Sequence, residues 1–186
     1  MKSLTFVTTI SRLAVLALLL PIGMLAAQNP DSPAVSKLLE EVKSHAAQAE
    51  DDADTLASYT LSNLDWKTHG SALNRMKEHV NDLIRDGNQL SSMRDEGSPW
   101  QQEAIDRISG LLPEMASNLT ATINILNSNK NQTKMRPYQD LAKNNQTLIH
   151  KAHEIIADFV DYSEAKEKAG ALERELQLPA DSESGS

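Results

Sequence analysis

Apolar residues recur every three or four positions along most of the chain, and no stretch alternates apolar and polar residues as a strand would. In residues 33–61 the spacing of four and three alternates throughout, which is a heptad pattern and keeps the apolar residues on one helix face. This face consists of Val35, Leu39, Val42, Ala46, Ala49, Ala53 and Leu56. The same rhythm in residues 66–94, 99–129 and 137–176 predicts three further amphipathic helices.

The expected helix starts carry capping signals. Ser32 and Ser98 each precede a proline, and serine as N-cap followed by proline at the first helical position favours a helix start. Asp65 is the expected N-cap of the second helix. Pro113 lies inside the third predicted helix, where a proline lacks the amide donor and crowds the preceding turn. We therefore expect a kink near residues 109–113.

Each of the last three predicted helices has one inward face, and Leu172 and Leu176 are expected to extend the face of the fourth. The face of the second helix consists of Trp66, His69, Leu73, Met76, Val80, Leu83, Gly87 and Leu90. The face of the third helix consists of Ala104, Ile108, Leu111, Met115, Leu119, Thr122 and Leu126. The face of the fourth helix consists of Tyr138, Leu141, Asn145, Leu148, Ala152, Ile155, Phe159 and Tyr162. None of the helices is apolar all round, so each needs its neighbours for stability. Short connections between them predict an all-α, antiparallel up-down-up-down four-helix bundle over residues 33–178, its third helix kinked near Pro113.

The first 27 residues form a separate unit by composition. Lys2 and Arg12 flank a polar opening, residues 13–20 are apolar, and small residues follow, as in a secretory signal peptide. A retained N-terminal anchor is the alternative, although the apolar run is shorter than the ~20 residues of a membrane span. We expect a periplasmic or secreted protein without membrane attachment after cleavage, with a linker at residues 28–32 and a disordered tail at residues 179–186.

Charge and cysteine content narrow the function. Without residues 1–27, which hold two basic and no acidic residues, 16 basic and 26 acidic side chains remain, a net charge of −10. Such a surface repels phosphate groups, which excludes nucleic acid as an expected partner. The chain has no cysteine, which excludes disulfides, thiolate metal sites and attachment of c-type haem, and favours a bacterial periplasm.

The sequence HKAHE, at residues 150–154, is the densest group of potential metal ligands. At about 100° per residue, His150 and His153 fall on the side of the fourth helix opposite Leu148. We therefore expect both to face solvent, with His150 beside Glu154. A weak surface metal site at this histidine pair is the alternative.

Three other histidines and one methionine are candidates for a cofactor. His69 occupies an inward position, where we expect a buried neutral imidazole hydrogen-bonded to Asn145, Tyr59 or a backbone carbonyl. His45 and His79 lie on the flanks of their faces and are expected at the level of Met115. Histidine and methionine at one level of a bundle could bind haem or a transition metal. A buried structural role is the simpler interpretation, and no cofactor is assigned.

The functional prediction is a binding protein. The sequence has no glycine-rich phosphate loop, nucleophile elbow, His-Glu-x-x-His motif or cysteine nucleophile, so we do not expect an enzyme. The leading interpretation is a non-catalytic module that binds a protein partner or associates with itself. The alternative is a small metal or haem carrier that uses the bundle histidines.

Overall fold

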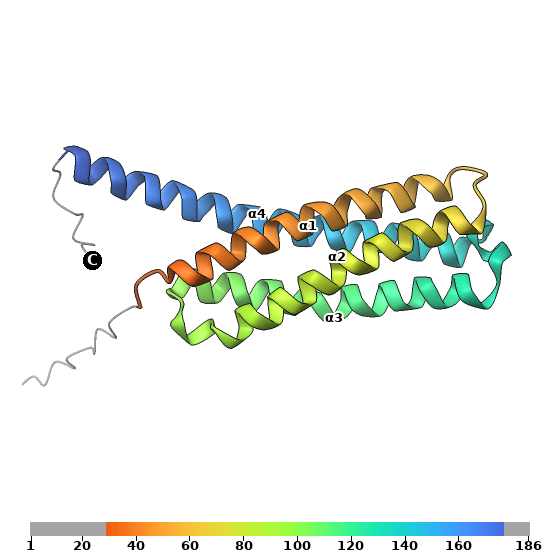
Figure 1. Ribbon diagram of the computed structural model, residues 1–186, viewed down its shortest axis with the longest axis horizontal. Helices are drawn as coiled ribbons and strands as arrows, with labels where there is room; N and C mark the ends of the chain where they lie inside the picture. The colour runs from red at the N-terminus through yellow and green to blue at the C-terminus, as the bar shows by residue number, and fades with distance from the viewer. Residues whose placement is uncertain (1–28, 177–186) are drawn as a thin grey trace, which may run out of the picture.

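The computed structural model describes residues 29–176, which form four long α-helices and two short 3-10 helices, with no strand in this range (Figure 1). The elements are α1 (Pro33–Thr60), α2 (Trp66–Ser92), η1 (Arg94–Glu96), α3 (Pro99–Ser128), η2 (Lys130–Lys134) and α4 (Arg136–Leu176). The predicted signal peptide and C-terminal tail lie outside the described residues. Among the described helices, none is both long and apolar enough to cross a membrane.

The helices form an antiparallel bundle in which each packs against two neighbours. α1 contacts α2 and α4, and α3 contacts the same two helices from the other side. Figure 1 shows successive helices running in opposite directions, with the α1–α2 and α3–α4 connections at one end and the α2–α3 connection at the other. The predicted all-α four-helix bundle is confirmed.

Side chains at the helix starts explain where three of the helices begin. The Ser32 hydroxyl accepts a hydrogen bond from the Val35 amide at 3.4 Å, and the Asp65 carboxylate accepts from the Thr68 amide at 2.9 Å. These bonds satisfy amides that have no partner inside the helix. At the start of α3, the buried Gln101 side chain accepts from the Ser98 amide at 3.0 Å and from the Ser32 amide at 2.8 Å. Gln101 therefore ties the first turn of α3 to that of α1.

The core is one continuous apolar cluster along the bundle axis. Every residue of the predicted inward face of α1 is buried, and so is every predicted inward residue of α2 except the half-buried Trp66. In α3, Leu111 is half-buried, and Leu112 next to it is buried instead. A β-carbon at Gly87 would overlap the Leu112 side chain, so the glycine allows this leucine to pack against α2.

α3 continues as one α-helix through Pro113, whose side chain is exposed. A proline on the outer side of a helix removes one hydrogen bond without disturbing the core. The bend that we expect at residues 109–113 stays a prediction.

The second half of α4 corrects the sequence analysis. After Ala152 the buried positions are Ile156 and Val160, whereas Ile155 and Phe159 are half-buried and Tyr162 is 50% exposed. A strict heptad pattern drifts by about 20° per heptad around a straight helix of 3.6 residues per turn. The predicted face therefore rotated away from the core along this long helix.

Leu172 and Leu176 do not extend the core either, because they are 47% and 63% exposed. α4 diverges from the other helices toward its C-terminal end (Figure 1), and the predicted bundle end at residue 178 lies outside the described residues and stays a prediction.

Candidate functional site

His69 is a structural residue of the core. Its side chain is buried, and its Nδ1 atom is hydrogen-bonded to the Tyr138 hydroxyl at 3.1 Å. Its ring also meets the rings of Tyr59 and Tyr138 edge-on. The predicted burial is confirmed, but the hydrogen-bond partner is Tyr138, because Asn145 instead donates to Thr122 at 2.8 Å.

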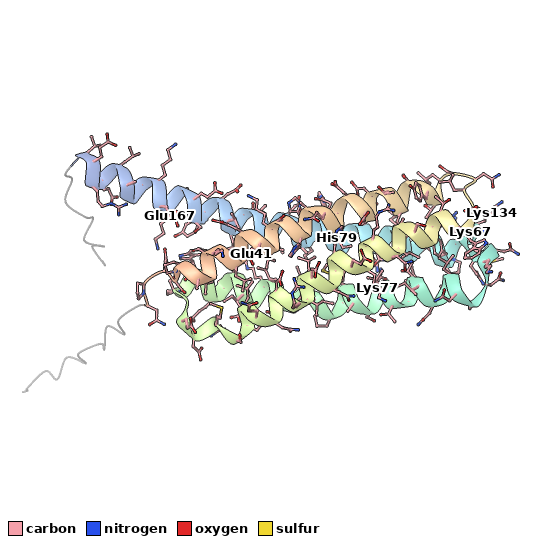
Figure 2. All side chains as sticks on the ribbon, in the orientation of Figure 1. Glu41, Lys67, Lys77, His79, Lys134 and Glu167 are labelled. Atoms are coloured by element: carbon pink, nitrogen blue, oxygen red, sulfur yellow. The ribbon has the colours of Figure 1, made fainter. Side chains whose placement is uncertain are left out.

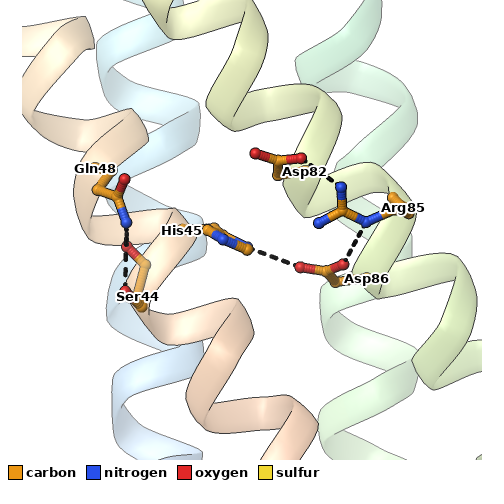
Figure 3. Close-up of polar contacts among 6 residues, drawn as sticks. All are labelled: Ser44, His45, Gln48, Asp82, Arg85 and Asp86. Carbon is orange, nitrogen blue, oxygen red and sulfur yellow. Dashed lines mark hydrogen bonds and ion pairs between the residues drawn. The ribbon is translucent and has the colours of Figure 1, made fainter.

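His45 lies between α1 and α2 and faces a buried carboxylate. Its Nδ1 donates to Asp86 at 2.7 Å, and the other oxygen of Asp86 accepts from Arg85 at 2.9 Å (Figure 3). Arg85 also pairs with Asp82 at 2.6 Å. Both oxygens of the buried Asp86 thus have a cationic or donor partner, and the group connects the two helices.

His79 forms the reciprocal contact on the same interface. Its Nδ1 lies 3.0 Å from one oxygen of Asp52, and the other oxygen accepts from Arg75 at 3.0 Å. Asp52 is on α1 and His79 on α2, the reverse of the His45–Asp86 pair. Seven residues separate the two pairs on each helix, which is about 10 Å along the axis.

The histidine candidates therefore do not form one ligand set. His45 and His79 lie about two helical turns apart, not at one level as expected, because the α1–α2 register sets each opposite an aspartate. Met115 is buried in the apolar core. Within residues 29–176 no group of three or more histidine, aspartate or glutamate side chains is arranged to hold a metal ion.

The prediction for HKAHE is confirmed for His150, which is exposed and lies beside Glu154, and is wrong for His153, which is half-buried where α4 meets α1. The Nδ1 atoms of His150 and His153 both donate to the carboxylate of Glu50 on α1, one to each oxygen. His153 is half-buried, while the more exposed His150 also contacts Glu154 at 3.2 Å. Counting 100° per residue gives only the angle between a side chain and the core direction of its own helix. It does not show that side chains on the flank of α4 can reach α1.

This cluster predicts a pH-dependent contribution to stability. Burial raises the pKa of Glu50, but the hydrogen bonds from His150 and His153 and the charges of these histidines together lower it by more. The hydrogen bond to Glu50, aided by the charge of Glu154, raises the pKa of His150. Because the pKa of Glu50 is lowered on folding, Glu50 stabilises the fold fully at pH values above the ordinary carboxyl pKa of 4.5. Because the pKa of His150 is raised on folding, His150 stabilises the fold fully at pH values below the ordinary histidine pKa of 6.5.

We therefore expect Glu50→Gln to destabilise the protein most between pH 4.5 and 6.5, with a smaller difference from wild type on either side. Thermal unfolding of both proteins across pH measures this. Glu114→Gln, at an exposed position of α3, is the control with the same loss of charge. A Glu50→Gln effect that is constant with pH would contradict the prediction.

An aromatic hollow opens between α3 and α4 where α4 begins to leave the bundle. Trp100 and Tyr162 meet edge-on with ring centroids 5.3 Å apart, and Arg107 lies 5.7 Å from the Phe159 ring. The hollow has a volume of about 330 Å³ and is lined by Trp100, Glu103, Arg107, Ile155, Asp158, Phe159 and Tyr162. Because Trp, Tyr and Arg are the residues most enriched at binding hot spots, the hollow is a candidate binding surface.

Asp31 holds one wall of this hollow in place. Its carboxylate accepts from the Trp100 indole at 2.7 Å and pairs with Lys166 at 2.9 Å. Burial raises the pKa of Asp31, but the hydrogen bonds from Lys166 and Trp100 and the charge of Lys166 act against this, and the pKa is lowered overall. The segment before α1 therefore fixes the orientation of the Trp100 ring.

Beyond the hollow, α4 continues without the support of the other helices. The Ser163 hydroxyl of α4 lies 3.5 Å from the Ser36 hydroxyl of α1. We call the thirteen residues of α4 that follow Ser163, residues 164–176, the overhang. At 1.5 Å per residue the overhang is about 20 Å long. Figure 1 shows this end of α4 diverging from the bundle, and Figure 2 labels Glu167 on it.

An apolar stripe begins just before the overhang and continues along it. We call it the outer stripe; it consists of Tyr162, Ala165, Ala169, Leu172 and Leu176, all exposed. The spacing of these residues is three, four, three and four, so they lie on one helix face. This face starts at Tyr162, which also lines the aromatic hollow. The hollow and the outer stripe thus form one continuous candidate surface.

Sequence reasoning identified Ile155, Phe159 and Tyr162 but assigned them to the core, and it did not consider Trp100 or Arg107. An apolar residue on a long helix gives the same signal whether it packs in the core or on a partner. The only available sign was that the fourth predicted helix is longer than the other three.

Comparison of the chain with protein-family models, with curated proteins and with solved structures found no significant match.

Proposed function

We propose that the protein is a non-catalytic protein-interaction module of the periplasm or the extracellular space. One observation carries this proposal: the aromatic hollow and the outer stripe together present six large apolar or aromatic side chains, three of them exposed, next to charged ones at one end of the bundle. A contiguous exposed apolar surface rimmed by polar residues is typical of a protein interface. Export is part of the proposal and rests on the pattern of residues 1–27.

The shape of this surface suits an amphipathic helix as the bound element. The outer stripe is straight and follows the overhang, and the hollow at its inner end is open and lined by aromatic rings. Helices bind such surfaces through apolar side chains that recur every three or four residues. A small molecule would find little enclosure on the overhang, whose stripe is exposed along its length.

The ionisable groups of the bundle support a non-catalytic role. Glu50, Asp52 and Asp86 each accept a hydrogen bond from a histidine or arginine side chain of a neighbouring helix. Their arrangement is accounted for by helix packing. The net charge of −8 for the whole chain also disfavours nucleic acid as a partner.

A metal or haem carrier is the second candidate and has less support. Such a site needs ligands that converge on one point, whereas His45 and His79 each face their own aspartate about 10 Å apart. The absorption spectrum and metal content of the purified protein test this candidate directly. A stoichiometric transition metal or a haem band would favour it over an interaction module.

The interaction surface can be tested by site-specific photo-crosslinking in cells that express the full chain. A photoreactive residue in place of Tyr162 or Leu172 is expected to give a crosslinked protein adduct. The same residue in place of Lys77, exposed on α2, is the control and is expected to give none. Adducts at neither Tyr162 nor Leu172, or equal adducts at Lys77, would overturn the proposal.

A further inference from the structure

We propose that the outer stripe pairs with the outer stripe of a second copy of this chain, so that two overhangs lie antiparallel in a short coiled coil. This inference rests on the proposed function and names the partner. It starts from the energetics of the overhang itself. In the described part of the chain no other helix packs on the exposed apolar side chains of the overhang, and most helical stability in proteins comes from tertiary packing of an amphipathic face. The stripe therefore gains stability if another apolar surface covers it.

The bundle does not cover the stripe, because the stripe lies on the opposite side of α4. At about 100° per residue, Ala165, Ala169 and Leu172 point roughly away from the direction of Ile156 and Val160, which face the core. Tyr162, Leu172 and Leu176 are accordingly 50%, 47% and 63% exposed. A partner helix can approach this face from outside the molecule without displacing α1 or α3.

The sizes of the stripe residues favour a second copy in antiparallel orientation. When two stripes run in opposite directions about a centre between Ala169 and Leu172, each small residue faces a large one. Ala165 meets Leu176 of the second copy, and Ala169 meets Leu172 of the second copy. A parallel pair in register would instead set alanine against alanine and leucine against leucine, which packs unevenly.

The charges beside the stripe point to the same arrangement. Lys166 and Lys168 flank its first half, and Glu173 and Glu175 flank its second half. In the antiparallel pair, Lys166 lies beside Glu173 of the second copy and Lys168 beside Glu175 of the second copy, and symmetry repeats both contacts. Flanking charges of this kind select the partner and the orientation of coiled coils.

These charged side chains remain available for a partner. Among the described residues, Lys166 pairs only with Asp31, and no ion pair is formed by Lys168, Glu173 or Glu175. Lys166 is itself half-exposed, so it can contact both Asp31 and a second copy. The overhang thus carries an apolar seam and a charge pattern that is complementary to itself.

Charge reversal tests whether the partner is a second copy. The variant Lys166→Glu/Lys168→Glu has only acidic flanks, and Glu173→Lys/Glu175→Lys has only basic flanks. Sedimentation is expected to show a concentration-dependent dimer for the wild type and dimerisation weakened at least about tenfold for each variant alone. An equimolar mixture of the two variants is expected to dimerise again, because every facing pair then has opposite charges.

A matched control separates this effect from a general change of charge. Lys143→Glu/Lys151→Glu alters two exposed lysines on the bundle part of α4 by the same total charge and is expected to dimerise as the wild type does. Circular dichroism verifies that all variants stay folded. A wild type that is monomeric at all concentrations, or variants that do not recover on mixing, would overturn the inference.

Cysteine crosslinking then tests the orientation, because the chain has no cysteine of its own. Ala165→Cys mixed with Leu176→Cys is expected to give a disulfide between the two variants, whereas Ala165→Cys alone gives little. Efficient crosslinking of Ala165→Cys to itself would show a parallel pair and refute the antiparallel arrangement. A monomeric wild type that still forms photo-adducts with another protein at Tyr162 would refute the second copy and leave the proposed function standing.

Discussion

Replacing Ile149 by alanine is expected to lower the free energy of unfolding by about 2–5 kcal/mol, the usual range for truncating a buried aliphatic side chain. Ile149 is 1% exposed and belongs to the part of the apolar core that α4 contributes. Removing three of its side-chain carbons loses buried apolar area and leaves a cavity that the surrounding helices fill only in part. Urea unfolding with an unchanged slope measures the loss.

Ile155→Ala is the matched comparison on the same helix. Ile155 is half-buried at the edge of the aromatic hollow, so its truncation exposes a surface that water already reaches. We expect a loss below about 2 kcal/mol, because little or no closed cavity forms. Equal losses for the two variants, or a larger loss at Ile155, would show that the heptad face inferred from the sequence continues into the core of the second half of α4.

The pH dependence of stability is expected to change when His69 is replaced by leucine. Burial lowers the pKa of His69, and the charge of Asp65 opposes this shift only in part. A histidine whose pKa is lowered on folding takes up protons more readily in the unfolded chain. The wild type therefore loses stability as the pH falls below 6.5, the ordinary value, until the folded pKa is reached.

His69→Leu removes this loss, so its stability should fall less steeply between pH 6.5 and the folded pKa. At neutral pH the same variant is expected to lose about 1–3 kcal/mol, because the buried Tyr138 hydroxyl is left without its partner. Adding Tyr138→Phe removes that unpaired hydroxyl and should restore most of the neutral-pH stability while keeping the flatter profile.

NMR titration of the wild type provides an independent check, because the pKa of His69 should lie below 6.5 and that of His150 above it. The contribution of the Glu50 cluster changes with pH above 6.5 through His150 and below 4.5 through Glu50, so the comparison is made between variants and not from the wild-type profile alone. A pKa of His69 at or above 6.5 would contradict the buried neutral imidazole.

The helices and their ends follow from local interactions, and the sequence alone was sufficient to predict them. Serine or aspartate caps followed by proline or a polar first turn act within a few residues, and the three-and-four spacing is a property of one helix. The predicted end of the second helix, residue 94, is two residues from Ser92, and the other helix ends agree at least as closely. All seven residues predicted for the inward face of α1 are buried, and the structure adds Leu38, which the three-and-four spacing left out.

The contacts between helices depend on how far each helix is shifted along its neighbour and on which side chains lie at the edges of the apolar faces. The sequence of a single helix does not determine either. Which residue of α2 lies opposite His45 is decided by how all four helices slide and rotate to fill the core, and that choice pairs His45 with Asp86 and Asp52 with His79. The contact of HKAHE with Glu50 has the same origin, because residues a hundred positions apart meet on the side of a helix interface.

Sequence periodicity determined that α4 is one long amphipathic helix, while the tertiary structure decided where its apolar face is used. Up to Ala152 that face is buried except for the half-buried Leu141, and beyond Ala152 the 3.6-residue turn rotates Phe159 and Tyr162 out toward the hollow. The outer stripe has the same spacing as a core face, since periodicity reports that a face is apolar and not what covers it. The tertiary structure shows that α1 and α3 do not cover the outer side of the overhang, so that face remains accessible to a partner.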